Sequence, residues 1–538
     1  MISLIGAQKT KSAVVLFFIV LIVLGNLIYK DYGMSTDEWR ERVTATVTAN
    51  YLAEKFAPSR VKEDVPALGT YKDRDYGVAF SLPAVILEYA LGIKSDKDIF
   101  YLRHLLTFLM FVVGVFAVYQ MSARRFESEW IGLLSALVLI LSPRIFADAF
   151  YNGKDIVFMA AYALAVNTLI IYVLSPTIKN ALIHAAVTAY AIDIRIMGIV
   201  VLAATIVIIA IRLFKKELVV RNILISLGLY LITASLLVVV MWPWLWTDPV
   251  GHFIEAFKNM SQFRWYGSEL FFGTYIKATE LPWYYVFIWV GITTPIIYLL
   301  FFIVGSGYTV FLAAVNHLKL WKNEHELQDY IFFAFFWAPV LAVIVLHSVL
   351  YNGWRQLYFI YPMFILLTTG GFILVWNRLG VLYKRILAVV LAGVLISVSG
   401  WMWKMHPMQN IYFNAFAGKD WTTKWPVDYW GLGNLAAVEY ILANDKNPKV
   451  NIYVASHTNL FLFFLLKNYQ DRDRINYVKS VEKANYILNN YYRNGRNDPK
   501  EVDEMSLKNF KVYYQVRDGD EVVLTVLQRK NQIKFENQ

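Results

Sequence analysis

The sequence predicts an all-α polytopic membrane protein of about eleven transmembrane helices, followed by a smaller α+β domain. Three observations support this fold class. First, 58% of the 538 residues are hydrophobic and only 17% are charged, whereas charged residues make up about a quarter of an ordinary soluble domain. Second, apolar runs long enough to cross about 30 Å of hydrocarbon recur along residues 1–403. Third, residues 404–538 are polar and numerous enough for one small soluble domain.

The apolar runs are expected to be membrane-spanning helices, because one crossing takes about 20 residues. An eleventh run, Ala181–Ala191, is shorter and fits a half-length or tilted helix. The first run lacks a small-residue cleavage site, so we interpret it as an anchor rather than a signal peptide. The ten longer runs are Ala13–Tyr29, Ile99–Met121, Trp130–Ala147, Ile156–Leu174, Ile199–Leu213, Ile223–Trp242, Tyr284–Val304, Ile331–Leu350, Leu357–Trp376 and Ile386–Trp403.

The positions of the Lys and Arg residues predict the orientation of the chain. They gather in alternate loops, and such loops face the cytoplasm in membrane proteins. The N-terminus is then cytoplasmic, the loop 30–98 and the domain 404–538 are extracytoplasmic, and we expect an inner (plasma) membrane location. Because topology explains the net charge of +11, no nucleic-acid partner is expected. The cations are Lys9, Lys11, Arg124, Arg125, Lys179, Lys215, Lys216, Lys319, Lys322, Lys384 and Arg385.

Outside the spans, local patterns predict further elements. The amphipathic segment Ala79–Leu91 is expected to lie as a helix on the outer surface. In the tail, Val450–Ala455 is expected to be a strand and Leu460–Leu466 a buried helix too short to span. Asp518-Gly519 stands between the alternating runs Phe510–Val516 and Glu521–Leu527, which predicts a β-hairpin.

Ser35-Thr36-Asp37-Glu38 follows the first span and is the first candidate for catalysis. Adjacent carboxylates at a membrane surface can supply a base for an acceptor hydroxyl, so Asp37 and Glu38 are predicted to be catalytic. The alternative is structural, because Ser35 and Glu38 have the spacing of a capping box that opens a helix. The two interpretations are compatible, since a capped helix would hold Asp37 at the positive end of the helix dipole.

The short outer loop that begins at Asp148 also contains Lys154 and Asp155. Ionisable groups at helix ends that face a cavity are functional candidates, because facing lipid is costly for them. The alternative is a solvated loop with an internal Lys–Asp pair.

Three arginines at predicted helix ends complete the candidates. Arg195, close to Asp193, lies in an apolar stretch, where the alternative is a buried structural ion pair. Arg355 and Arg103 lie at the ends of spans, where long cationic side chains also reach toward lipid headgroups. The guanidinium group is planar and matches phosphate oxygens, so the three arginines and Lys154 are predicted to bind phosphate.

Acids and cations on one membrane face suit displacement of a phosphate leaving group from a sugar carbon. The competing class is a transporter or flippase for lipid-linked glycans, in which intramembrane charges mark an ion path. The sequence has no internal repeat and no nucleotide-binding loop, and both absences count against a transporter.

The order of these segments resembles the GT-C glycosyltransferases, and most closely family 39, with its protein-O-mannosyltransferase-like members and aminoarabinose transferases. The acidic pair after the first span and the long outer loop carry the resemblance, which extends to Gly431. The other matching pieces are Tyr101-Leu102-Arg103, Ser142-Pro143-Arg144-Ile145-Phe146, Asn152-Gly153-Lys154-Asp155, Asn352-Gly353-Trp354-Arg355 with Tyr358, Tyr361-Pro362, His406-Pro407, Tyr412-Phe413-Asn414 and Asp428-Tyr429-Trp430-Gly431.

The resemblance implies an enzyme that transfers a sugar from a polyprenyl-phosphate donor to a glycan, lipid or protein acceptor on the extracytoplasmic face. It implies Asp37 as the base of an inverting displacement, and Arg195, Arg355 and Lys154 as holders of the leaving phosphate. A GT-C-like O-antigen polymerase or ligase with a diphosphate-linked donor is the second alternative. The sequence identifies no metal ligands and leaves divalent-metal dependence open. The trefoil-type lumenal domain of protein O-mannosyltransferases is absent from this sequence.

Overall fold

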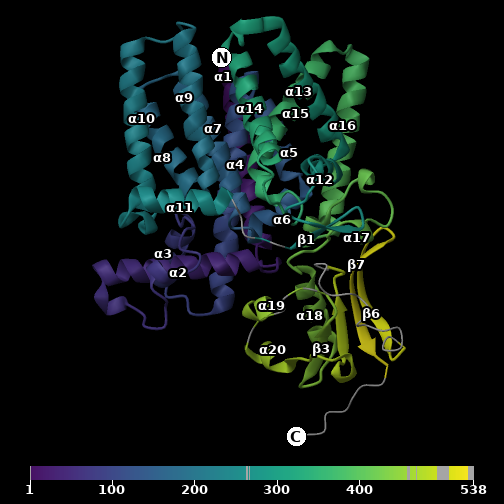
Figure 1. The fold of residues 1–538 in the computed structure, drawn as a ribbon. Helices are drawn as coiled ribbons and strands as arrows, with labels where there is room; N and C mark the ends of the chain where they lie inside the picture. The colour runs from purple at the N-terminus through teal and green to yellow at the C-terminus, as the bar shows by residue number, and fades with distance from the viewer. Residues whose placement is uncertain are drawn as a thin grey trace.

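The computed structural model describes residues 2–261, 265, 267–456, 458, 461–467, 469–492 and 508–530. Its described residues form a large helical bundle with a small sheet domain below one end (Figure 1). Long helices form the bundle. Their apolar residues occupy nearly every position rather than one face, which is typical of buried or membrane-spanning helices. These helices are α1 (Ile2–Ile28), α4 (Asp96–Phe126), α5 (Glu129–Ile140), α7 (Asp155–Leu174), α8 (Ile178–Ile194), α9 (Ile199–Phe214), α10 (Val220–Met241), α13 (Ile296–Asn316), α14 (Glu324–Val345), α15 (Tyr361–Arg378) and α16 (Val381–Lys404).

Within the described residues, nine helices are long and apolar enough to cross a membrane, or ten if a bent pair counts as one span. The bent pair is α5 with α6 (Pro143–Tyr151), which meet at 73°. The predicted number was about eleven, and α8 accounts for the difference. At 17 residues α8 is the half-length helix that the sequence predicted, and it packs between α7 and α10.

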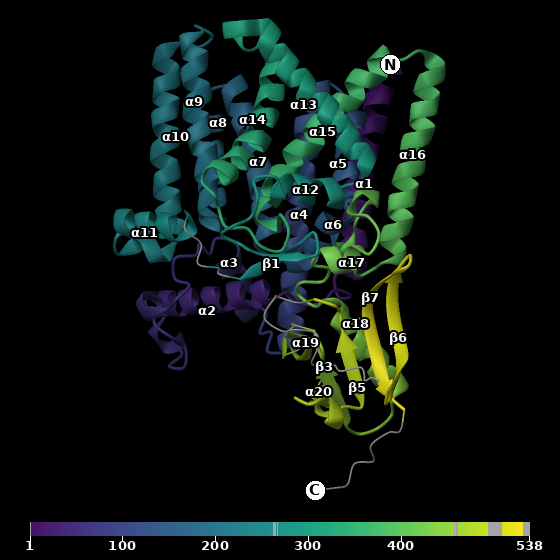
Figure 2. The same cartoon turned by 45° about the vertical axis from the view of Figure 1, so that its right-hand side comes forward.

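The two ends of the bundle differ in content (Figures 1 and 2). One end carries the N-terminus and the connections α9–α10, α13–α14 and α15–α16. At the opposite end, α2 (Thr36–Phe56) and α11 (Pro249–Ser261) lie across the direction of the long helices. The short helix α3 (Ser81–Ala90) lies beside α2, where the sequence predicted a surface helix at Ala79–Leu91. The predicted catalytic segments and the predicted cationic loops are therefore at opposite ends.

Residues 405–432 pack onto the bundle before the chain enters the sheet domain. Met405, Phe413, Trp425 and Trp430 belong to the same buried apolar cluster as the long helices. Asn414 Nδ2 donates to the carbonyls of Gly291 and Thr294, both at 2.6 Å. The short elements of this end are β1 (Ser268–Phe271), β2 (Thr274–Lys277), α12 (Tyr285–Thr293) and α17 (Trp421–Lys424).

The small domain has a five-stranded sheet in the order β4-β3-β5-β7-β6. β3 runs parallel to β4 and β5, whereas β7 is antiparallel to β5 and β6. The predicted hairpin is confirmed, because Asp518 pairs with Glu521 across a turn in which Gly519 has φ +60°. The elements are α18 (Gly433–Asn444), β3 (Val450–Val454), α19 (Phe461–Leu465), α20 (Tyr469–Arg474), β4 (Ile475–Tyr477), β5 (Tyr486–Asn489), β6 (Phe510–Asp518) and β7 (Glu521–Arg529). α19 is the predicted short buried helix, and residue 460 of that prediction lies outside the described residues.

Candidate active site

The first acidic segment folds as its capping pattern predicts. The Ser35 hydroxyl accepts the backbone N–H of Glu38 at 3.1 Å and so caps α2. The same hydroxyl donates to the backbone carbonyl of Tyr151 at 2.8 Å, which ties the start of α2 to the end of α6. The directions of the side chains in the first turn of α2 are therefore fixed relative to the bundle.

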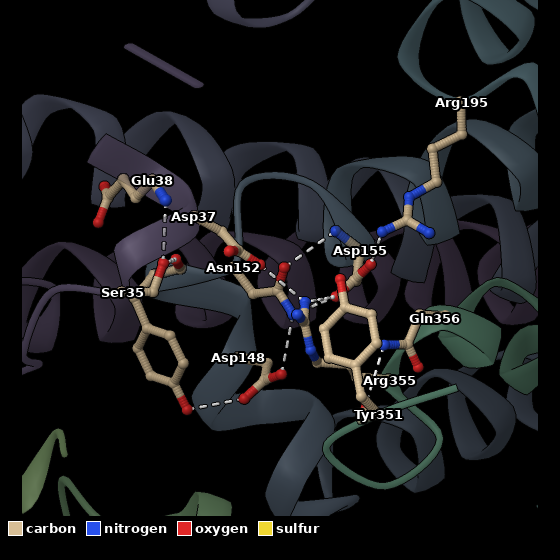
Figure 3. A network of polar contacts seen from close by, with 11 residues as sticks. Ser35, Asp37, Glu38, Asp148, Asn152, Asp155, Arg195, Tyr351, Arg355 and Gln356 are labelled. Carbon is tan, nitrogen blue, oxygen red and sulfur yellow. Dashed lines mark hydrogen bonds and ion pairs between the residues drawn. The ribbon is translucent and has the colours of Figure 1, made fainter. Parts of the chain in front are cut away.

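Asp37 and Glu38 point in different directions (Figure 3). Asp37 Oδ2 lies 2.8 Å from Nη1 of Arg355. Glu38 is buried, and its Oε2 lies 3.2 Å from Nε2 of His104, whose Nδ1 lies 3.1 Å from the carbonyl oxygen of Tyr29. Because a carbonyl only accepts, Nδ1 carries a hydrogen, and the Glu38–His104 contact needs a further proton on Nε2 or on the carboxyl. The structure brings Asp37 to Arg355 and turns Glu38 toward His104 on α4.

Asp155, the first residue of α7, joins two arginines from distant parts of the chain (Figure 3). Its Oδ2 accepts from Nη1 of Arg355 at 2.8 Å, and its Oδ1 pairs with the guanidinium of Arg195. Asn152 fixes this carboxylate, since it donates to Oδ2 at 3.0 Å and accepts the Asp155 backbone N–H at 2.9 Å. Only 1% of the Asp155 side chain is exposed, against 19% of Arg195. Part of the Arg195 side chain therefore remains exposed, whereas its Asp155 partner is buried.

Asp148 is also buried, and its hydrogen-bond partners are neutral. The Tyr151 hydroxyl donates to its Oδ1 at 2.7 Å, and Asn152 Nδ2 donates to its Oδ2 at 3.0 Å. Asp148 therefore supports Asn152, which in turn orients Asp155.

Lys154 belongs to a second part of the site, around Glu41. Its Nζ lies 3.4 Å from the centre of the Tyr76 ring. Burial lowers the pKa of Lys154 to about 8, opposed first by the nearby Glu41 carboxylate. Burial likewise raises the pKa of Glu41 to about 7, opposed first by Lys154. Glu41 stands four residues after Asp37, on the same face of α2. The sequence reasoning missed Glu41, although this spacing on a predicted helix could have identified it.

Arg103 is held apart from the Asp155 cluster. It is buried on α4, and its Nη1 lies 3.5 Å from Oε1 of Glu88. The other Glu88 oxygen accepts from Nε of Arg42 at 3.0 Å. Arg103 thus pairs with Glu88 on α3, and its charge opposes the raised pKa of Glu41.

Aromatic rings surround the guanidinium of Arg355. Its Cζ lies 4.9 Å from the ring centre of Tyr351, 5.1 Å from that of Trp430 and 5.8 Å from that of Tyr429. Such rings stabilise a cation and fix the guanidinium plane. Two of the segments that carry the family resemblance, 352–355 and 428–431, therefore meet at the side chain of Arg355.

The arrangement offers an anion two guanidinium groups and one ammonium group, next to carboxylates that can accept a proton. Among the residues that the structure describes, no group of three or more His, Cys, Asp or Glu side chains could hold a metal ion. The side chains gathered at the site can supply acid–base and electrostatic chemistry.

Comparisons with known proteins agree with the expected resemblance. Residues 86–246 match the family model described as dolichyl-phosphate-mannose-protein mannosyltransferase. No curated protein sequence matches the chain. The structure is similar to ArnT from Cupriavidus metallidurans bound to undecaprenyl phosphate, with a TM-score of 0.51 and 13% identity over 96% of this chain and 98% of that chain.

The apo oligosaccharyltransferase of Archaeoglobus fulgidus is also similar, with a TM-score of 0.46 and 10% identity over 87% of this chain and 65% of that chain. The ArnT-like GT-C fold predicted from the motif order is confirmed, as is a membrane protein with several apolar helices.

Proposed function

We propose that this chain is a membrane glycosyltransferase that moves a sugar from a polyprenyl-phosphate donor to a glycan, lipid or protein acceptor. The observation that carries the proposal is the meeting of Asp37 with Arg355 and Arg195 around the buried Asp155. The undecaprenyl phosphate in the ArnT crystal structure supports a lipid monophosphate as the donor group.

In the proposed reaction, the donor phosphate competes with the carboxylates of Asp37 and Asp155 for the two guanidinium groups. Arginine can bind phosphate through two parallel N–H donors, whereas the contacts of Arg355 with Asp37 and Asp155 both use Nη1. Asp37, released from Arg355, then accepts the proton of the acceptor hydroxyl. The hydroxyl oxygen bonds to the anomeric carbon as the carbon–phosphate oxygen bond breaks, so the configuration inverts and the electron pair leaves with the phosphate.

Charge stabilisation in this step comes from cations placed before the reaction. Arg355, Arg195 and Lys154 would neutralise the negative charge that develops on the leaving phosphate. Glu38, held by His104, would support the start of α2 rather than act as the base.

We propose an extracytoplasmic site in the inner (plasma) membrane, with the N-terminus in the cytoplasm. The cation-rich connections at the end opposite the site support this orientation. Membrane lipids would surround the bundle and present the donor from the bilayer.

Purified protein in detergent tests the proposal with sugar donors linked to undecaprenyl phosphate and to undecaprenyl diphosphate. We expect transfer and release of undecaprenyl phosphate from the monophosphate donors. Asp37→Asn should lower the rate by about 10²-fold or more, because a general base contributes about 10²–10⁴-fold.

Thermal unfolding of Asp37→Asn should match that of the unsubstituted protein. Full activity of Asp37→Asn would remove the base assignment. Transfer only from diphosphate donors would favour a polymerase or ligase, whereas a flippase would form no product without a second compartment.

A further inference from the structure

Glu41 places a carboxylate directly against the loop that carries Lys154. A side-chain carbon at position 153 would lie only 2.8 Å from Oε2 of Glu41, so Gly153 provides the space that this carboxylate occupies. Oε2 is shielded from solvent and has no hydrogen-bond partner among the described residues. A shielded carboxylate oxygen without a donor depends on nearby charges for its stabilisation.

Charged groups on α2, on α4 and at the start of α7 lie near Glu41. These groups include both carboxylates and cations. One of the cations is Lys154, which the proposed phosphate site could use. The groups are Asp37 on α2, Arg103 on α4, Lys154 and Asp155 at the start of α7, with Tyr76 and Arg195 facing Lys154.

We infer that Glu41 sets the affinity of the site for a lipid-borne phosphate, by neutralising Lys154 and repelling the phosphate while it is ionised. This inference rests on the proposed function. When Glu41 is protonated, Lys154 keeps its charge beside the Tyr76 ring and can join Arg195 and Arg355. When Glu41 is ionised, the ammonium is already neutralised and a second negative group stands next to the phosphate position.

The direction of the pH dependence follows from the two groups. The pKa of Glu41 is raised to about 7 and that of Lys154 is lowered to about 8, in both cases chiefly by burial. Below about pH 7 the carboxyl is neutral and the amine is charged, which favours an anion. Rising pH first charges Glu41 and then discharges Lys154, and both changes weaken phosphate binding.

Undecaprenyl phosphate binding to the full chain in nanodiscs, measured from pH 6 to 8, tests the inference. The phosphate of the ligand titrates near pH 6 itself, so the informative quantity is the ratio of the affinities of two proteins at each pH. Glu41→Gln should bind within twofold of the unsubstituted protein at pH 6. At pH 7.5 it should bind about five- to tenfold more tightly, the size expected for one like charge within about 10 Å at a partly buried site.

Two further variants separate the mechanism from its alternatives. Glu54→Gln makes the same charge change at an exposed position of α2 and should leave the ratio near one. Lys154→Gln should weaken binding at pH 6 to 7, and in that background Glu41→Gln should tighten binding at pH 7.5 by less than it does when Lys154 is present, because only the direct repulsion remains. If Glu41→Gln does not accumulate as folded protein, the binding of undecaprenyl phosphate to Lys154→Gln still tests whether Lys154 contributes to phosphate affinity.

The outcomes are distinguishable. A pH-independent ratio for Glu41→Gln, weaker binding in that variant, or equal tightening in the Lys154→Gln background would overturn the inference and leave the proposed function standing. Absence of undecaprenyl phosphate binding to the unsubstituted protein at every pH would overturn the proposed function itself.

Discussion

Helix geometry at the start of α2 determines which carboxylates reach the arginines. Asp37 and Glu41 are four residues apart and share a face, whereas Glu38 is rotated by about 100° from Asp37. The sequence places Asp37 and Glu38 next to each other, and adjacency in sequence suggested a catalytic pair. In the structure the pair at the site is Asp37 with Glu41, because residues four apart lie one turn apart on the same face of α2.

A buried acid near Arg355 predicts a pH dependence of stability. Glu269 on β1 is 2% exposed, and burial raises its pKa to about 8, against the lowering effects of the Asn352 backbone N–H and Arg355. A raised pKa in the folded state means that its stabilising contribution is present in acid and is lost as pH rises from about 4.5 through 8. Glu269→Gln should therefore gain stability relative to the unsubstituted protein across this range, by about 5 kcal/mol at pH 9.

Thermal unfolding of both proteins at pH 5, 7 and 9 measures this difference. Glu280→Gln is the matched control, because Glu280 is exposed just after the β1–β2 hairpin and pairs only with the exposed side chain of Lys277 among its recorded contacts. A constant difference between Glu269→Gln and the unsubstituted protein from pH 5 to 9 would show that Glu269 is ionised throughout.

At the scale of elements, apolar runs predicted the helices well, since each run corresponds to one helix or to two consecutive ones. The run Tyr284–Val304 is divided at Thr294-Pro295 into α12 and α13. What the runs could not predict is where a helix breaks. The run Trp130–Ala147 was expected as one span, but Pro143 cannot continue the backbone ladder of α5, and α6 leaves at 73°. This bend carries Asp148, Asn152 and Asp155 into the site. Bends and crossings depend on contacts between distant segments, which periodicity does not record.

The crossing of α13 and α15 depends on two glycines. A side-chain carbon at Gly305 would lie 2.0 Å from the Leu367 carbonyl oxygen, and one at Gly371 would lie 1.9 Å from that of Phe301. Small residues let membrane helices approach closely, and backbone cannot move aside for an added methyl group. We expect Gly305→Ala and Gly371→Ala each to lower the free energy of unfolding by about 2–3 kcal/mol.

Gly307 provides a control on the same helix, because a carbon added there meets no atom within 4 Å. Thermal unfolding in detergent should place Gly307→Ala at or slightly above the unsubstituted protein, since Ala favours helix more than Gly. Equal loss of stability in Gly305→Ala and Gly307→Ala would instead point to helix propensity or lipid contact, and not to the α13–α15 crossing.

At the scale of the whole molecule, the segment 428–430 connects the sheet domain to the candidate site. Asp428 Oδ2 accepts the Gly433 backbone N–H at 2.8 Å, and Asn490 Nδ2 donates to the Asp428 carbonyl at 2.9 Å. Two residues further on, Trp430 contacts Arg355. Composition predicted that the chain becomes polar after residue 403. It could not show that residues 405–432 pack against the helical bundle. We therefore propose that the independent part of the tail begins after Leu432.

The orientation of the whole chain can be tested with single cysteines, because the natural sequence has none. We predict that Lys216→Cys, exposed in the α9–α10 connection, reacts with a membrane-impermeant maleimide only after cells are opened. Asp520→Cys in the β6–β7 turn and Lys62→Cys after α2, both exposed, should react in intact spheroplasts. The physical reason is the positive-inside rule, which assigns the connections rich in Lys and Arg to the cytoplasm.

The cysteine-free protein controls for background labelling. Labelling of Lys216→Cys in intact spheroplasts, with protection of the other two, would invert the topology and place the site where a cytoplasmic sugar nucleotide could reach it.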